Sequence, residues 1–238
     1  MSPVSSGELE AQTTLHLHPT APLAPRVLLP GDPGRALMLA QALLAEPKMF
    51  NHNRGLWGYT GTAADGESLT IQSTGMGGPS AAIVLHELVA LGARRAIRVG
   101  TCGALLATLE LGDLVVASEA ICADGTSRAL GAGERAGADP GLDAALRASA
   151  PAAVSGAVVS VDLFYEDSKR TREHDAIAVE MEAAALFALA ATLRVAVGCM
   201  LCVSDTFAED GERRRIDVDT LRESVERMGA HALAALPT

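Results

Sequence analysis

The chain has 238 residues, of which 49% are hydrophobic and 3% aromatic, and its formal charge is −10 at pH 7. This size and hydrophobicity suit one sizeable α/β domain, while no apolar run reaches the roughly 18 uninterrupted residues of a membrane span. The negative charge argues against a nucleic-acid polymer or an anionic membrane as partner, because both select a basic face.

The first residues of the chain and its cysteines indicate where in the cell the protein is expected. Residues 1–14 have no basic head and no apolar run, so we expect a flexible tail rather than a signal peptide, followed by one folded domain over residues 15–238. Four cysteines without an export signal indicate reduced thiols and a cytoplasmic protein. Cys199 and Cys202 have Cys-x-x-Cys spacing, but residues three apart on a strand point to opposite faces, which argues against a metal or redox site.

A strand is predicted at residues 26–30 and a helix at residues 34–46. Asp32 is a good N-cap, and the proline after it suits the first helical position. Arg35 lies at the N-terminus of this helix, directly after the strand and Gly31. This arrangement is typical of a phosphate-binding site.

Two histidines precede this strand. His16 and His18 would share one face of an extended segment, and a metal pair is conceivable. The sequence offers no third ligand nearby, which favours a structural or hydrogen-bonding role.

A hairpin and a glycine-rich stretch follow the first helix. Residues 51–55 form a polar loop, and residues 56–62 and 68–73 predict a hairpin that turns near Asp65. The stretch at 74–80 lacks the third glycine of a Rossmann fingerprint, because Ser80 stands in its place. We therefore predict no dinucleotide site there.

The centre of the chain is the stretch at residues 98–104, where a strand is expected to end near Arg98 and open into a glycine turn. Such a turn would expose backbone N–H groups and the Thr101 hydroxyl beside a guanidinium, which makes an anion pocket at the carboxyl edge of a sheet. The alternative is a tight turn with a solvated arginine.

The remaining pattern completes an α/β fold with helices on both faces of a mixed or parallel sheet. The stretch at 124–140, rich in glycine and alanine, is expected to be the least ordered interior part. Further elements are predicted as helices at 80–91, 143–149, 183–193 and 218–236, and as strands at 114–122, 157–161 and 195–203.

In the second half of the chain, three sets of polar or aromatic residues each allow a structural and a functional interpretation. Phe164, in an aromatic pair, either packs or stacks on a base. Glu180 and Glu182 stand at a helix N-terminus, where the macrodipole favours acids, although two carboxylates there could also grip vicinal hydroxyls. Asp205, after Ser204, either caps the next segment or meets a ligand at the carboxyl end of a strand.

Six motifs in order resemble the nucleoside phosphorylase family, which includes the hexameric bacterial purine nucleoside phosphorylases and the uridine phosphorylases. They are Pro-Gly-Asp-Pro-x-Arg at 30–35, Arg-Gly at 54–55, Ser-Thr-Gly-Met-Gly-Gly-Pro-Ser at 73–80, Arg-Val-Gly-Thr at 98–101, Val-Glu-Met-Glu-Ala at 179–183 and Val-Ser-Asp at 203–205. The likeness covers residues 15–236 and is nearest to the hexameric purine enzymes. It implies a single domain with a central, partly barrel-like mixed sheet, flanked by helices.

The resemblance also implies reversible phosphorolysis of purine (2′-deoxy)ribonucleosides in purine salvage, with inorganic phosphate as co-substrate and neither metal nor other cofactor. The implied phosphate ligands are Gly31, Arg35, Arg98 and Thr101, with Arg54 reaching into the neighbouring subunit's site. The implied ribose contacts are Met76, Met181, Glu182 and a partner histidine, for which His16 is the better candidate and His18 stays open. The implied base contacts are Cys102, Gly103, Phe164, Val179, Glu180, Ser204 and Asp205.

The chemistry agrees with these roles. Phosphorolysis passes through an oxocarbenium-like sugar, so arginines must position a dianionic nucleophile, and Glu182 must hold the sugar hydroxyls. A purine leaves well once N7 is protonated, a task for Asp205 as general acid. The purine enzymes pair this aspartate with a later arginine, for which Arg213 and its two neighbours are all candidates.

Other functions stay open. Uridine phosphorylases carry Phe-Tyr-x-x-Gln-x-Arg, whereas here Ser168 replaces the glutamine and only Arg170 remains, which favours purines. A hydrolytic nucleosidase would not need the three arginines, and a nucleoside-binding protein would not need the catalytic groups. The family works as dimers that complete each other's sites, so we expect self-association, with a homohexamer as the implied state. The sequence does not distinguish dimer from hexamer, or 6-oxo from 6-amino purines.

Overall fold

The computed structural model describes residues 14–165, 174–207 and 213–236. The expected tail therefore lies almost wholly outside the described residues, as do Ser168 and Arg170. The strands are β1 (Arg26–Leu29), β2 (Leu44–Asn51), β3 (Gly58–Ala63), β4 (Ser68–Gln72), β5 (Arg95–Ala104), β6 (Leu114–Cys122), β7 (Arg135–Gly137), β8 (Val154–Ser160), β9 (Ala178–Glu180), β10 (Ala196–Phe207) and β11 (Arg213–Arg215). The helices are α1 (Pro33–Leu43), η1 (Asn53–Gly55), α2 (Gly78–Ala90), α3 (Gly125–Ala129), α4 (Pro140–Ser149), α6 (Ala183–Leu193) and α7 (Val218–Ala235).

The described strands form one mixed sheet in the order β11-β10-β6-β8-β9-β5-β1-β4-β3-β2, with β7 beside β6. Because β5 also pairs with β10, the strands β5, β10, β6, β8 and β9 close into a barrel. The strands β1, β4, β3 and β2 continue the sheet outward from β5, beyond the barrel. The expected α/β fold with a mixed, partly barrel-like sheet is confirmed.

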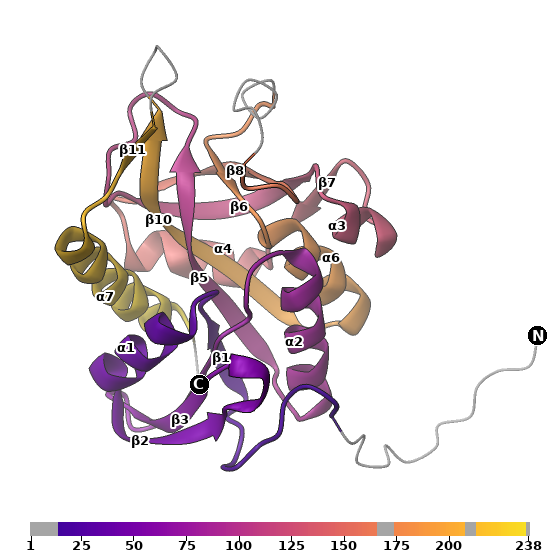
Figure 1. Cartoon of the computed structure of the whole chain (residues 1–238), viewed down its shortest axis with the longest axis vertical. Coiled ribbons are helices and arrows are strands. Elements are labelled where there is room, and N and C mark those ends of the chain that lie inside the picture. Colours follow the sequence, from indigo (N-terminus) through magenta and orange to yellow (C-terminus); the bar gives the residue numbers. More distant parts are fainter. Residues whose placement is uncertain (1–13, 166–173, 208–212, 237–238) are drawn as a thin grey trace, which may run out of the picture.

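Helices cover both faces of the sheet (Figure 1). On one face α2 and α6 pack over a core that includes Leu85 and Leu186, and on the other α1, α4 and α7 pack over a core that includes Leu146 and Met228. Each such side chain, when fully buried, contributes roughly 1.5–3 kcal/mol relative to exposure. No helix in the described part of the chain is long and apolar enough to cross a membrane.

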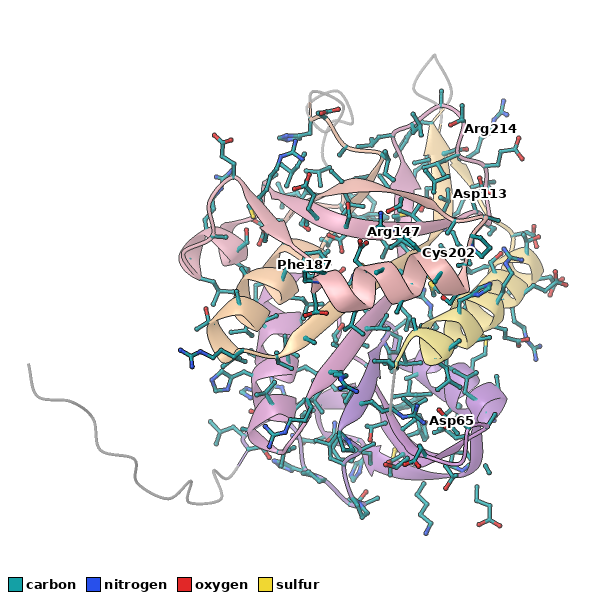
Figure 2. All side chains as sticks on the ribbon, turned by 180° about the vertical axis from the view of Figure 1, so that it is seen from behind. Asp65, Asp113, Arg147, Phe187, Cys202 and Arg214 are labelled. Carbon is teal, nitrogen blue, oxygen red and sulfur yellow. The ribbon has the colours of Figure 1, made fainter. Side chains whose placement is uncertain are left out.

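The Cys-x-x-Cys pair is split between these cores, as its strand geometry predicts. Cys199 belongs to the α2 and α6 side and Cys202 to the α4 and α7 side, where Figure 2 shows it between those helices. All four cysteines are buried free thiols.

The first helix begins as predicted and ends early. The Asp32 carboxylate accepts the Arg35 N–H at 2.6 Å, but α1 ends at Leu43 instead of residue 46 because β2 starts at Leu44 and pairs with β3. The interior of β2 is exposed and contains Pro47, so it has no strand-like alternation of apolar residues. For that reason the sequence pattern does not predict β2, and the expected polar loop at 51–55 is the end of β2 followed by η1.

The expected glycine turn at residues 98–104 is wrong, because β5 continues through this stretch to Ala104. Its two glycines give room to neighbouring side chains. A Cβ at Gly100 would lie 2.6 Å from Cζ of Arg98, and one at Gly103 would lie 3.1 Å from Cγ1 of Val179. In this strand glycine marks close approach rather than a turn.

Three further differences concern the second half. The stretch at 124–140 contains α3, capped by Asp124, and β7, which pairs with β6. The strand expected at 157–161 starts earlier and ends at Ser160. The last core strand extends beyond residue 203 to Phe207, and the three arginines form β11 along its edge. At the top of Figure 1 the C-terminal ends of β5 and β10 lie beside β11.

Candidate active site

Arg98 is the buried cation of the site. Its side chain lies over Gly100, and only 3% of the residue is exposed. Its Nε donates to Oε2 of Glu180 at 2.9 Å, and its Nη2 lies 2.6 Å from Oε2 of Glu182. Burial alone would lower the pKa of Arg98, but Glu182 and Glu180 raise it, so the guanidinium stays charged. The alternative of a solvated arginine is therefore wrong.

Glu180 contacts both Arg98 and the N-terminus of α6. Its fully buried carboxylate accepts the Ser160 hydroxyl through Oε1, and it accepts the N–H groups of Glu182 and Ala183 at 2.9–3.0 Å. Burial raises the pKa of Glu180, and Arg98 opposes that effect. The side chain thus stabilises the N-terminus of α6, as the macrodipole reading expected, and its oxygens are engaged inside the protein. Whether this residue also borders a base stays a prediction.

Glu182 joins a glycine loop to Arg98. Its Oε1 accepts the Gly77 N–H at 2.6 Å, and its Oε2 meets the guanidinium. Gly75 and Gly77 both have positive φ values, of 74° and 84°, which glycine adopts without steric cost. Met76 between them is 87% exposed. The half-buried Met181 precedes Glu182 in the chain, so the three residues of this chain that are expected to contact a ribose lie in this loop and at the N-terminus of α6.

The loop after β1 lies against the loop after β4. The Thr74 N–H donates to the carbonyl of Pro30 at 2.8 Å, and a Cβ at Gly31 would be 3.3 Å from the Gly75 carbonyl oxygen. Burial lowers the pKa of Arg35, opposed by Asp32 and reinforced by the charge of Arg98. The two arginines are thus within electrostatic range of each other.

Thr101 lies on the α1 side of β5. It is half-buried and pairs with Cys202 of β10. Gly31, Arg35 and Thr101 therefore line the C-terminal ends of the adjacent parallel strands β1 and β5, the edge at which α/β sheets bind ligands.

A β-bulge in β10 determines the face of the sheet on which the Asp205 side chain lies. Val203 pairs with Cys102 and Asp205 pairs with Gly103, so Ser204 is the extra residue. Because side chains alternate along a strand, one extra residue moves every later side chain to the opposite face. The Ser204 hydroxyl then donates to Oδ2 of Asp205 at 2.7 Å.

Arg213 is the arginine that pairs with Asp205. Its Nε donates to Oδ1 of Asp205 at 2.8 Å, and its Cζ lies 4.3 Å from the centre of the Phe164 ring. Asp205 is thus an ion-paired strand residue, and the alternative that it caps the next segment is wrong. Phe164 is 47% exposed and meets Tyr165 edge to face at 5.1 Å. Arg214 projects from the outer edge of the molecule (Figure 2).

The expected base contacts around β5 pack together. Gly103 pairs with Val179 of β9, and a Cβ on Gly103 would be 3.2 Å from the Phe207 ring. Phe207 is not among the predicted site residues, because the predicted strand ends at residue 203. Burial raises the pKa of the Cys102 thiol well above its ordinary value, so this residue packs rather than reacts.

His16 and Arg54 lie at a separate corner built from the N-terminal segment, η1 and α2. His16 Nδ1 is 2.8 Å from Oε1 of Glu87 on α2, and Asn53 Nδ2 donates to the His16 carbonyl at 2.9 Å. His18 is tied to this corner through its N–H, which donates to Oδ1 of Asn51 at 2.8 Å. Arg54 is exposed and has a φ of 56°, a strained conformation for a residue with a side chain.

The candidate residues are spread along β5. The Arg98 guanidinium lies over Gly100, and Asp205 lies opposite Gly103, three residues further along β5. At ~3.3 Å per residue this separation is ~10 Å. Glu182 lies at the cationic end, with Asp205 and Phe164 at the other.

Comparison with known proteins shows that residues 25–237 match the phosphorylase superfamily. The chain is 35% identical to the DeoD-type purine nucleoside phosphorylase of Oceanobacillus iheyensis, over 77% of this chain and 83% of the relative. It is 37% identical to that of an Exiguobacterium species, over 77% and 81%. It is 36% identical to that of Alkaliphilus metalliredigens, over 80% and 86%.

Proposed function

The chain belongs to the phosphorylase superfamily, and we propose on that basis that it is a purine nucleoside phosphorylase of purine salvage. This pentosyltransferase cleaves the glycosidic bond of purine (2′-deoxy)ribonucleosides with inorganic phosphate and releases the free base and (deoxy)ribose 1-phosphate. The observation that carries the proposal is the grouping of Arg98, Glu182 and Asp205, which are far apart in the sequence, around adjacent strands of one barrel.

Phosphate binds at the Arg98 end in this proposal. Arg98 and Arg35 supply permanent charge, and Gly31 and Thr101 supply backbone and hydroxyl groups at the strand ends. Glu182 accepts the two ribose hydroxyls, with Met76 and Met181 against the sugar. The contact of Glu182 with Arg98 supports this arrangement, because it brings the hydroxyl acceptor next to the nucleophile's site.

The base binds between Phe164 and the Gly103–Val179 pair, with Asp205 donating a proton to N7 as the bond breaks. The Arg213–Asp205 ion pair supports this role, because an arginine can hold the carboxylate in position and neutralise it after the proton has left. Acid catalysis of this kind contributes on the order of 10² to 10⁴ in rate.

The site is completed by a second copy of the chain. Within one chain, Arg35 and Arg98 are balanced by Glu180 and Glu182, so a phosphate dianion arrives with no net positive charge to meet it. Arg54, exposed on a strained turn that is tied to His16, supplies the missing cation from the partner, and His16 binds the ribose 5′ hydroxyl. We propose a dimer of this kind as the unit of a homohexamer.

The reaction needs neither a metal nor an organic cofactor, because phosphate is the nucleophile and Asp205 is the acid. Prolonged treatment with a chelator should therefore leave the rate unchanged. The buried free thiols support a cytoplasmic location, where such thiols stay reduced.

Initial rates on inosine, guanosine, adenosine and uridine, with and without phosphate, test the proposal. We expect phosphate-dependent release of purine bases and no cleavage of uridine. Faster cleavage of uridine would replace the purine assignment with a uridine phosphorylase on the same fold.

A further inference from the structure

Ser160 is a buried residue that neither the sequence motifs nor the comparisons assign to the site. It ends β8 and pairs in register with Glu180 of β9. Its hydroxyl donates to Oε1 of Glu180 and accepts the Ala184 N–H at 2.9 Å. One serine thus connects a barrel strand, a helix N-terminus and the carboxylate that holds Arg98.

We propose that Ser160 is a positioning residue for phosphate binding: by fixing the Glu180 carboxylate, it sets the orientation of the Arg98 guanidinium. This inference rests on the proposed function, in which Arg98 binds phosphate. It extends that function to a residue that touches no substrate.

The contacts explain why the serine matters. The Ser160 hydroxyl engages Oε1 of Glu180, which leaves Oε2 facing Nε of Arg98 at 2.9 Å. The rest of Arg98 is confined by Glu182 and by the backbone at Gly100. A guanidinium binds phosphate through a planar fork, so a small rotation misaligns both of its hydrogen bonds at once.

The test is the Ser160→Ala variant, with KM measured separately for phosphate and for inosine. We expect KM for phosphate to rise about 5- to 20-fold, while KM for inosine changes by less than about twofold. Ser127→Ala is the matched control, because Ser127 is also fully buried and also donates to a carboxylate, that of Asp124 at the cap of α3. It should lower thermal stability and leave both KM values unchanged.

The outcomes separate the two proposals. Phosphate-dependent wild-type activity together with a Ser160→Ala variant whose KM for phosphate matches that of Ser127→Ala would overturn the role of Ser160 alone. An equal rise in both KM values would overturn it too, since a general loss of structure has that signature. A wild-type enzyme that ignores phosphate would overturn both proposals.

A second variant covers poor folding of the first. Ser160→Cys keeps the size of the side chain and a weak donor, so we expect a smaller but still selective rise in KM for phosphate, of about 2- to 5-fold. An unchanged KM for phosphate in this variant would also contradict the proposal.

Discussion

Gly100 makes room for the Arg98 side chain, and this close approach is open to a direct test. A Cβ in the Gly100→Ala variant would lie 2.6 Å from Cζ of Arg98, a guanidinium that two carboxylates prevent from moving away freely. We expect kcat/KM for phosphate to fall about 10- to 100-fold, because a shift of about 1 Å in a positioning group costs that much.

The control for this change is Gly137→Ala, in β7. A Cβ at Gly137 meets no atom within 4 Å, so this variant should behave like wild type. Normal phosphate kinetics in Gly100→Ala would mean that the guanidinium can bind phosphate from another position.

Arg213 and Arg214 are sequence neighbours with different surroundings, and they give a matched pair. Arg213 pairs with Asp205 and stacks on Phe164, whereas Arg214 projects outward (Figure 2). We expect Arg213→Ala to lower kcat on inosine about 10- to 100-fold, a part of what acid catalysis contributes, with little change in KM for phosphate. Steady-state kinetics that are equally affected in Arg214→Ala would refute a specific role for Arg213.

At the level of secondary structure, the sequence predicts the elements whose apolar pattern is strong. The helix at 183–193 and the strand at 114–122 have the predicted bounds, because both are mostly apolar and charged residues lie close to each end of both. Four strands escape prediction: β2, β7, β9 and β11. Of these, β7 and β9 have three residues each, too few for a periodic pattern. The interior of β2 is exposed on an edge, and β11 consists of three arginines that form a strand because they pair with β10.

The hairpin of β3 and β4 is joined to the first strand by an ion pair whose strength depends on pH. Arg26 is buried and donates to both carboxylate oxygens of Asp65 at 2.5 and 2.6 Å, and this hydrogen bonding lowers the pKa of Asp65 to about 2. The unfolded value is about 3.9. A carboxyl whose pKa falls on folding stabilises the protein above its unfolded pKa, so this contribution is present above about pH 4 and is lost as the pH drops towards 2.

Chemical denaturation at several pH values measures this contribution. We expect Asp65→Asn to lower the free energy of unfolding at pH 7 by about 1 kcal/mol, since Asp65 is 39% exposed and solvent screens the pair. The difference from wild type should shrink below about pH 3. Glu134→Gln, a change at an exposed carboxylate, is the control. A difference for Asp65→Asn that does not change with pH would show that the lost contribution is not ionic.

For the whole molecule, the central prediction is that two chains share each site. Arg98→Ala and Arg54→Ala should each be nearly inactive alone. In a mixed dimer, one site combines an intact Arg98 with an intact Arg54 from the partner, so co-refolding equal amounts should restore about a quarter of wild-type activity. Continued inactivity of the mixture, with dimers verified by light scattering, would place both arginines in the same chain's site.

The candidate site could be predicted from the sequence where a motif carries its residues, and could not where the fold alone brings residues together. Arg98, Glu182 and Asp205 follow from their motifs. The contact of Ser160 with Glu180 depends on the register between β8 and β9, and the aim of Asp205 depends on the bulge at Ser204. Strand register and bulges arise from pairing across the sheet, which local sequence patterns do not encode.

The most direct test of the proposed function is the fate of inorganic phosphate. Incubation of the wild-type protein with inosine and phosphate, followed by ³¹P NMR, should show a sugar phosphate resonance that grows as hypoxanthine appears, and neither should appear when phosphate is left out. Release of hypoxanthine at the same rate without phosphate, with free ribose as the product, would contradict the role given to Arg35, Arg54 and Arg98 and identify a hydrolase.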